Sequence, residues 1–299
     1  MIRVVGTIFA GLLGLAFGSF LNVCLSRWPE GESIVHPRSH CRSCGRTLAW
    51  WENVPLVSWL ALRGRCRSCG AGISWRYPLV ELAVGVLWAV AAWQVLASTT
   101  SPAAADLLWA VTIHGLSQMI LLWLLVALSI LDFEHLWLPN KVTLPGMLLG
   151  YVTTLLYAAV NSKRVFAFYG VLGLRSRFMW DIAWQRLLAI LVAAGVILVT
   201  RWIYWLIRRR EGIGLGDAKL MALLAAWLGL PGALLSFVIG VLLGAVAAIV
   251  VLLLPSARRD QERWAQTKLP LGTFLCVGGI VSSLWGQSII YAYLRWAGF

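Results

Sequence analysis

The sequence predicts an all-α polytopic membrane protein with about eight transmembrane helices and one small cytoplasmic loop domain. Hydrophobic residues make up 60% of the chain and the mean hydropathy is +0.81, whereas a soluble domain is roughly 45–50% apolar. Only 12% of the residues are charged. Several apolar runs approach the ~20 residues that a helix needs to cross ~30 Å of hydrocarbon. These observations favour a chain that crosses the bilayer repeatedly.

The apolar runs set the expected helices in chain order. The first run follows Arg3 and resembles a signal peptide, but it has no A-x-A-like cleavage site, so we expect it to remain as a helix. The sixth run is short. The expected spans are Val4–Leu25, Leu79–Ala97, Leu107–Leu131, Val142–Val160, Leu187–Ile207, Ala218–Leu230, Ala233–Leu254 and Thr273–Leu294.

The distribution of Lys and Arg indicates the orientation. Cytoplasmic loops carry an excess of these residues. With the N-terminus outside, 17 of the 25 Lys and Arg residues lie in or beside the inside segments. These segments are 26–78, 132–141, 208–217 and 255–272. The outside segment 161–186 holds five and is the exception; we expect an insertion or an interfacial hairpin there. The charge run at 255–270 reads as a solvated connector.

The net charge of +13 fits basic loops at an anionic lipid surface. No motif of a nucleic-acid-binding module is visible, so we expect membrane lipid rather than nucleic acid as the partner of these charges.

Four cysteines in segment 26–78 form two identical motifs. Cys41-Arg-Ser-Cys44 and Cys66-Arg-Ser-Cys69 are each followed by glycine, with 21 residues between them. Four thiolates at this spacing suit tetrahedral Zn²⁺. A segment of ~50 residues with little apolar content builds little core, so a metal would stabilise it. A redox pair or free thiols is the alternative.

Two acids stand where apolar runs reach water. Asp132 closes the run 120–131, and Asp217 opens the run 220–230. In the expected topology both acids lie at the cytoplasmic face. Acids at the edge of the membrane are costly and are by default candidates for function. Two close carboxyl groups can share one proton and act as base and acid, so the pair predicts an aspartyl peptidase.

Residues around the two acids have expected supporting roles. Glycines at 212, 214 and 216 remove side chains, so a substrate backbone or a partner helix can approach closely. Pro139 ends the helix after Asp132 and turns the chain into the next span. Lys219 either positions a substrate group or faces lipid headgroups, and the second is favoured for a lone lysine at a membrane edge. Glu134 and His135 read as surface residues of the turn.

An ordered set of motifs along nearly the whole chain resembles the type IV prepilin peptidases, which are intramembrane aspartyl proteases of the GxGD class. The motifs are Gly18-Ser19-Phe20-Leu21-Asn22-Val23, the two cysteine motifs, Glu52-Asn53-Val54-Pro55, Leu56-Val57-Ser58-Trp59, Arg76-Tyr77-Pro78-Leu79-Val80-Glu81, Asp132 with Leu138-Pro139-Asn140, Gly214-Leu215-Gly216-Asp217 with Lys219, and Pro270-Leu271-Gly272-Thr273-Phe274-Leu275.

The resemblance implies a location in the bacterial inner membrane and Asp132 and Asp217 as the catalytic pair. Gly214, Gly216, Lys219, Pro139 and Asn140 are the implied supporting residues. The implied substrates are prepilins or pseudopilins, whose short basic leader is cleaved after a glycine at the cytoplasmic boundary. The cysteine-bearing loop implies the bifunctional branch, which methylates the new N-terminal amine with S-adenosylmethionine. No glycine-rich motif for that cofactor is visible, and its residues stay unassigned.

The expected organisation is therefore a first helix at 1–25, a four-cysteine domain at 26–78 and a peptidase domain at 79–299. Two alternatives remain open: a peptidase without methyl transfer, and a transporter or assembly scaffold whose acids bind ions or protons. The sequence does not indicate the oligomeric state.

Overall fold

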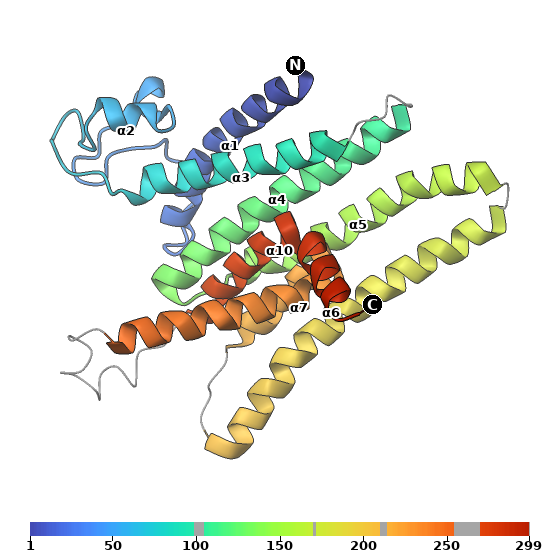
Figure 1. Ribbon diagram of the computed structural model, residues 1–299. Helices are drawn as coiled ribbons and strands as arrows, with labels where there is room; N and C mark the ends of the chain where they lie inside the picture. Colours follow the sequence, from blue (N-terminus) through green and yellow to red (C-terminus); the bar gives the residue numbers. More distant parts are fainter. Residues whose placement is uncertain (99–104, 170–171, 210–213, 254–269, 299) are drawn as a thin grey trace. The chain divides into compact units, whose positions relative to one another are not determined.

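The computed structural model describes residues 1–98, 105–169, 172–209, 214–253 and 270–298 (Figure 1). Within these residues the chain is helical, and its β structure is limited to two isolated bridges. In order, the elements are α1 (Ile2–Arg27), η1 (Trp50–Asn53), α2 (Val57–Ala61), α3 (Arg76–Ser98), α4 (Ala105–His135), α5 (Asn140–Tyr169), α6 (Leu172–Arg208), α7 (Leu215–Leu253) and α10 (Leu271–Trp296).

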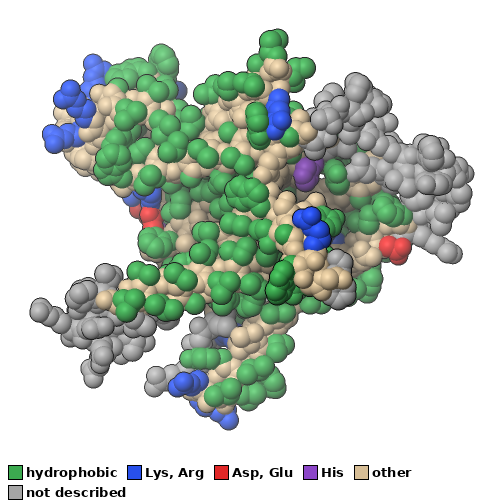
Figure 2. Space-filling model, viewed as in Figure 1, with side chains coloured by type: hydrophobic (Ala, Val, Ile, Leu, Met, Phe, Trp, Pro, Cys, Tyr) green, Lys and Arg blue, Asp and Glu red, His purple; other side chains and the backbone are tan. Residues whose placement is uncertain are grey.

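Seven of the described helices are long and apolar enough to cross a membrane, so the predicted polytopic helical fold is confirmed. Large hydrophobic side chains are exposed along them, for example Phe9 (62% exposed) on α1 and Leu242 (60%) on α7. Figure 2 shows these side chains covering the helices, with Lys and Arg gathered over the α2 region and at one end of α6. Exposed apolar surface of this extent is what a helix facing lipid presents.

The chain divides into two compact units. The first comprises Met1–Ala103 with Gln118–Ala127, and the second comprises Ala104–Ser117 with Leu128–Phe299. In the first unit α1 packs along α3 through glycines. A Cβ atom on Gly18 would lie 2.7 Å from Glu81 Cα, and one on Gly14 would lie 2.9 Å from Gly85 Cα. Small residues at such contacts let helix backbones approach closely.

In the second unit α5 and α6 pack against each other as antiparallel neighbours (Figure 1). The stretch 161–186, where we expected an insertion or an interfacial hairpin, consists of two helix ends, because α5 continues to Tyr169 and α6 begins at Leu172. Polar and basic residues in this stretch do not oppose a helix, and its sequence holds no proline. The expected connector at 255–270 lies almost wholly outside the described residues.

The sixth and seventh expected spans form one element, α7, interrupted at Gly229. This glycine adopts φ 73° and ψ 177°, a conformation reserved for glycine, and Pro231 follows. Beyond the break, Ser282 on α10 donates to the Gly232 carbonyl (2.9 Å). Further on, Gly244 lies against Phe274.

Asp217, at the start of α7, lies near Asp132, and Asp132 accepts a hydrogen bond from Thr273 on α10. The start of α7 and Gly244 therefore both lie beside the first turn of α10. The chain therefore reverses at Gly229, as two separate spans require. Segments 215–228 and 230–253 are accordingly two antiparallel helical stretches, and the count of about eight spans agrees with the fold.

Partly buried polar side chains link the broken helix to its neighbours. Arg186 of α6 donates to the Ala225 carbonyl (3.3 Å), and Thr154 of α5 donates to the Ala226 carbonyl (3.3 Å). The last carbonyls of a helix have no partner within the helix. Here side chains of adjacent helices take that role.

Candidate active site and metal site

Asp132 lies in the last turn of α4 and is only 6% exposed. Its Oδ2 atom accepts the backbone N–H of Thr273 at 2.7 Å. The hydroxyl of Thr273 lies 3.2 Å from the same oxygen and 3.0 Å from the Ser129 carbonyl, so it can donate to either. Thr273 stands in the first turn of α10, where backbone N–H groups lack helical partners. The carboxyl group of Asp132 thus occupies the N-terminal end of α10.

Gly272 makes room for this arrangement. A Cβ atom at this position would lie 2.8 Å from Asp132 Oδ2 and 2.9 Å from its Cγ. Any larger residue would have to displace the carboxyl group.

Asp217 lies in the first turn of α7 and is 8% exposed. Its Oδ2 atom accepts the backbone N–H of Gly214 at 3.2 Å. Gly214 precedes the first helical residue, so this bond is the carboxylate half of a capping box. The predicted placement of Asp217 at a helix start is confirmed, and the positive end of the helix dipole stabilises the carboxylate there.

The two acids lie close together although 85 positions separate them in the sequence. The charge of Asp132 acts directly on Asp217. Both carboxyl groups also act on the fully buried thiol of Cys276 on α10. The second unit thus brings together the ends of three helices, α4, α7 and α10, around two carboxyl groups.

The turn between α4 and α5 packs beside the start of α7. A Cβ atom on Gly216 would lie 3.1 Å from the Leu138 side chain, so the close neighbour of this glycine is the turn rather than a partner helix. Pro139 precedes α5, and its carbonyl accepts the Thr143 backbone N–H at 3.0 Å. Because α4 ends at His135 and α5 begins at Asn140, the expected helix break beside Pro139 is present.

Lys219 differs from the favoured expectation of a headgroup-facing lysine. Its Nζ atom donates to Asn140 Oδ1 at 2.7 Å, which fastens the start of α7 to the start of α5. Glu134 Oε2 lies 3.9 Å from His135 Nε2, and both side chains are partly exposed, in agreement with their expected surface position. Gly212 lies outside the described residues.

Sequence reasoning assigned no role to Thr273 or Gly272. Their motif, Pro270 to Leu275, was available as part of the family resemblance, but its contact with Asp132 spans 141 positions. Nothing in the local pattern indicates this contact.

The four motif cysteines of the first unit converge. Their sulfur atoms all lie within 4.8 Å of one another, and Cys41 Sγ is 3.8 Å from Cys69 Sγ. A tetrahedron with metal–sulfur bonds of about 2.3 Å has sulfur–sulfur edges of about 3.8 Å. Cys41, Cys44, Cys66 and Cys69 therefore form a group that can hold a metal ion.

The two cysteine motifs adopt the same conformation. In the first, Cys41 N–H donates to Arg46 O (2.9 Å); in the second, Cys66 N–H donates to Ala71 O (2.8 Å). The following glycines, Gly45 and Gly70, both have φ 71°, which glycine adopts without steric cost.

Backbone N–H groups favour thiolates in both motifs. Those of Cys44 and Ser43 lower the pKa of Cys41 to about 6. Those of Cys69 and Ser68 lower the pKa of Cys66. Thiolates are the form that binds metal.

The fold and these two sites define a class: a multi-pass helical membrane protein with a buried carboxyl pair and a separate four-cysteine module. Comparison with known proteins identifies the family. Residues 12–95 match the bacterial peptidase A24 N-terminal domain, and residues 119–249 match the type IV leader peptidase family.

Full-length relatives extend this match. The chain is 33% identical to a prepilin leader peptidase/N-methyltransferase of Pseudomonas aeruginosa over 96% of this chain and 93% of that protein. It is equally similar to the protein of the same name from Stutzerimonas stutzeri, with the same shares covered. The Myxococcus xanthus relative is 37% identical over 82% of this chain and 63% of that protein. The chain therefore belongs to the type IV leader peptidase family. No solved structure matches it.

Proposed function

We propose that this protein is an aspartyl endopeptidase of the bacterial inner membrane that removes the basic leader of prepilins or pseudopilins at the cytoplasmic face. The observation that carries the proposal is the pair Asp132 and Asp217: both are buried at the ends of membrane helices, and they lie close enough for the charge of Asp132 to act on Asp217. The names of the relatives and the bias of Lys and Arg toward the inside segments support it.

Peptide hydrolysis requires a base for water and an acid for the leaving amine. In the proposed reaction one carboxylate takes a proton from a water molecule, whose oxygen attacks the peptide carbonyl carbon. The other carboxyl group gives its proton to the peptide nitrogen as the carbon–nitrogen bond breaks. Two carboxyl groups in close contact favour this division, because both do not ionise easily at once.

Supporting residues hold the two acids in place. Thr273 and Gly214 each donate a backbone N–H to one carboxyl group. Asn140 and Lys219 link the two helix starts beside the site. Pro139 lies in the turn that approaches α7, and Gly216 of α7 leaves room for that turn. Preorganised donors of this kind fix reactive groups at little cost during the reaction.

We further propose that the protein transfers a methyl group from S-adenosylmethionine to the new N-terminal amine, as the names of its relatives suggest. Zn²⁺ held by Cys41, Cys44, Cys66 and Cys69 would have a structural role, since four thiolates saturate its coordination. The segment that carries them is polar and short, so metal binding would contribute to its folding.

Cleavage of a synthetic prepilin peptide with a basic leader tests the peptidase. Asp132→Asn and Asp217→Asn should each lower the rate at least about 10²-fold, the scale of one lost acid–base group, while the proteins stay folded. Asp181→Asn, a matched change of an exposed acid on α6, should leave the rate unchanged. Undiminished cleavage by either site variant would refute the pair, and altered transport with intact processing would favour the scaffold. Mass spectrometry of the product separates the bifunctional enzyme from a plain peptidase by one added methyl group.

A further inference from the structure

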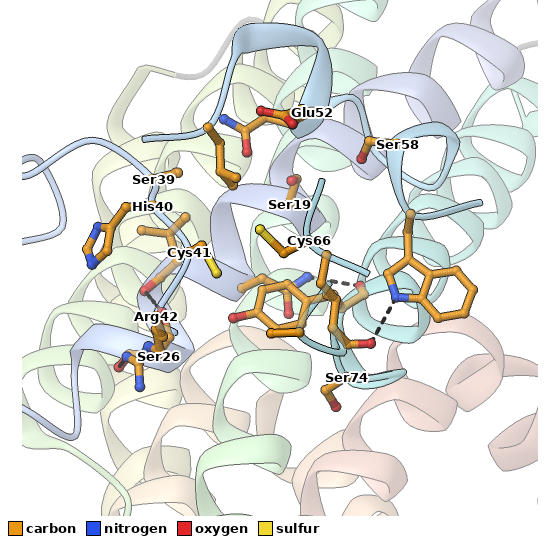
Figure 3. A pocket seen from close by; sticks show the side chains of 18 of the residues that line it. Ser19, Ser26, Ser39, His40, Cys41, Arg42, Glu52, Ser58, Cys66 and Ser74 are labelled. Carbon is orange, nitrogen blue, oxygen red and sulfur yellow. Dashed lines mark hydrogen bonds between the residues drawn. The ribbon is translucent and has the colours of Figure 1, made fainter. Parts of the chain in front are cut away.

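Helix α2 of the first unit has an apolar side that points away from the fold. Val57 is 61% exposed and Leu60 is 66% exposed, and their spacing of three residues places them on one side of the helix. The opposite side carries Ser58 and Trp59, which line a large cavity of about 630 Å³ (Figure 3). The helix thus has an inner side on the cavity and an outer apolar side that the described part of the chain leaves open.

Three contacts fix α2 against the start of α3. The backbone N–H of Leu56 donates to Glu81 Oε2 at 2.8 Å. The indole N–H of Trp59 donates to the Ile73 carbonyl at 3.2 Å. The ring of Trp59 also packs on Trp75, with ring centroids 4.2 Å apart, and Trp75 directly precedes α3. The outer side of α2 is therefore held in one orientation.

The same contacts set the level of α2 relative to the bilayer. Helix α3 is long and apolar enough to cross a membrane and begins at Arg76. Glu81 lies about 7.5 Å further along the helix axis, and helical side chains lean back toward the N-terminus, so the bond to Leu56 lies near the first turn. In that turn Leu79 already exposes 60% of its surface, as a side chain facing lipid does. Helix α2 therefore lies beside the boundary at which α3 enters the hydrocarbon.

Arginines follow the apolar side of α2 in the chain. Arg63, Arg65 and Arg67 are exposed, and residues 57–76 contain four arginines and no acid. Figure 2 shows Lys and Arg gathered over this region. A basic cluster next to a membrane helix is attracted to anionic lipid, whereas the basic leader of the proposed substrate would be repelled by it. Charge therefore favours lipid over the substrate as the partner of this surface.

We infer that the outer side of α2 lies on the bilayer surface, with Val57 and Leu60 among the upper acyl groups and Arg63 and Arg65 beside anionic phosphate groups. Trp75 stands at the boundary, where indole rings are enriched. A segment with apolar residues on one side and basic residues beside them binds such an interface. The contact holds the cysteine-bearing segment against the membrane that α3 crosses. It depends on neither the peptidase nor the methyl-transfer proposal.

Lipid photo-crosslinking of the full-length protein in vesicles tests the inference. A phospholipid with a diazirine at the top of its acyl chain labels the side chains that it touches, and mass spectrometry maps the labelled peptides. In vesicles that contain phosphatidylglycerol, residues 57–62 should be labelled. Leu60→Asp should lower this labelling about tenfold or more, because it removes a leucine side chain from lipid.

Val35 provides the matched control, because it is an equally exposed apolar residue of the same cysteine-bearing segment. Its neighbours Ser33 and Pro37 accept hydrogen bonds from Arg27 at the end of α1. Asn22 of α1 bonds the Tyr77 carbonyl, so Arg27 lies about 7.5 Å beyond the start of α3. Val35 should therefore stay unlabelled, and Val35→Asp should leave the labelling of residues 57–62 unchanged.

The role of charge is tested by the lipid composition. When phosphatidylcholine replaces phosphatidylglycerol, labelling of residues 57–62 should fall about fivefold or more in the wild type. A double variant, Arg63→Gln with Arg65→Gln, should be labelled weakly in both lipids. An equally strong signal in both lipids from the wild type would overturn the assignment of phosphate groups to the two arginines.

Two measurements in detergent, where no bilayer is present, check that Leu60→Asp is folded. Cleavage of a prepilin peptide reports on the second unit, and limited proteolysis reports on segment 26–78. The variant should match the wild type in both, because the changed side chain is exposed. No labelling of residues 57–62 in the wild type would mean that lipid does not cover this side and would overturn the inference. Equal labelling of the wild type and the Leu60→Asp variant would overturn it as well.

Discussion

Thr273 is a positioning residue for one of the two acids. It presents a backbone N–H and a hydroxyl to the same oxygen of Asp132, and Gly272 leaves the space that this contact requires. The carboxyl group is thereby held at a helix N-terminus. Small displacements of a reactive group are costly to catalysis, so the orientation of Asp132 depends on α10 as much as on α4.

Thr273→Val tests this role, since it keeps the backbone N–H and removes the hydroxyl. We expect kcat for leader cleavage to fall about tenfold, the scale of one lost hydrogen bond to a charged group, with KM little changed. Steady-state kinetics on a prepilin peptide measures both constants. Thr273→Ser, which restores the hydroxyl, should recover most of kcat. A Val variant as fast as the wild type would show that the backbone bond alone suffices.

Local patterns reveal some site residues but not others. The cysteine cluster follows from motif spacing, because each cysteine pair lies within four consecutive residues followed by a glycine, and this short motif sets its own turn. The aspartates follow from their places at the ends of apolar runs. Thr273 and the Lys219–Asn140 bond depend on contacts between distant helices. Hydropathy does not encode such contacts.

The break in helix α7 depends on Gly229 and on side-chain donors that bind the backbone carbonyls preceding it. The break leaves carbonyls at the end of segment 215–228 without intrahelical partners. Arg186 and Thr154 supply donors from two neighbouring helices. The reversal that follows sets α10 beside the second half of α7 and so places Thr273 at Asp132.

Arg186→Met should destabilise the second unit by about 1–3 kcal/mol, because it leaves the buried carbonyl of Ala225 without its donor. Reversible unfolding in mixed detergent measures the change in the free energy of unfolding. Arg208→Met, at the exposed end of the same helix, is the matched control and should change stability little. Equal stability of both variants would mean that the guanidinium group contributes nothing at the break.

Gly229→Ala provides a second test of the break. A side chain at φ 73° and ψ 177° is strained, at a cost of about 1–3 kcal/mol, and its Cβ would lie 2.9 Å from Arg186 Nη1. We expect lower stability by the same unfolding measurement and slower cleavage. Gly195→Ala, whose Cβ would meet open space in α6, should have neither effect.

The existence of the membrane helices followed from apolar runs of sufficient length, but their ends did not. Residues 161–169 and 172–186 extend two helices beyond the predicted spans, because basic and other polar residues lower hydropathy without opposing helical dihedral angles. The break in α7 was anticipated as a boundary between two spans. Its conformation at Gly229 and its donors from α5 and α6 were not.

At the scale of the molecule, the two units divide the proposed chemistry. The carboxyl pair lies within one, and the cysteine cluster and the large cavity lie within the other. Each has its own family match along the chain. Damage to one site should therefore leave the other measurable.

Removal of the proposed metal tests the structural role of the cysteine cluster. Cys44→Ser, or a strong chelator, should expose segment 26–78 to limited proteolysis, because in our proposal metal–thiolate bonds rather than a large apolar core stabilise that segment. Cys276→Ser is the matched control, since this buried cysteine of α10 lies outside the cluster. It should leave the segment protected. Metal analysis should give one ion per chain in the wild type and less in Cys44→Ser. An unchanged digestion pattern after complete metal loss would contradict the structural role.

The reversal at Gly229 has a consequence for the surrounding lipid. Segment 215–228 is 14 residues long and rises only about 21 Å, which is shorter than ~30 Å of hydrocarbon. A short segment favours local thinning of the bilayer, and in this chain the short segment carries Asp217 in its first turn. The rate of leader removal should therefore depend on the acyl-chain length of the lipid. Vesicles of shorter-chain phospholipids should support faster leader removal than vesicles of longer-chain ones.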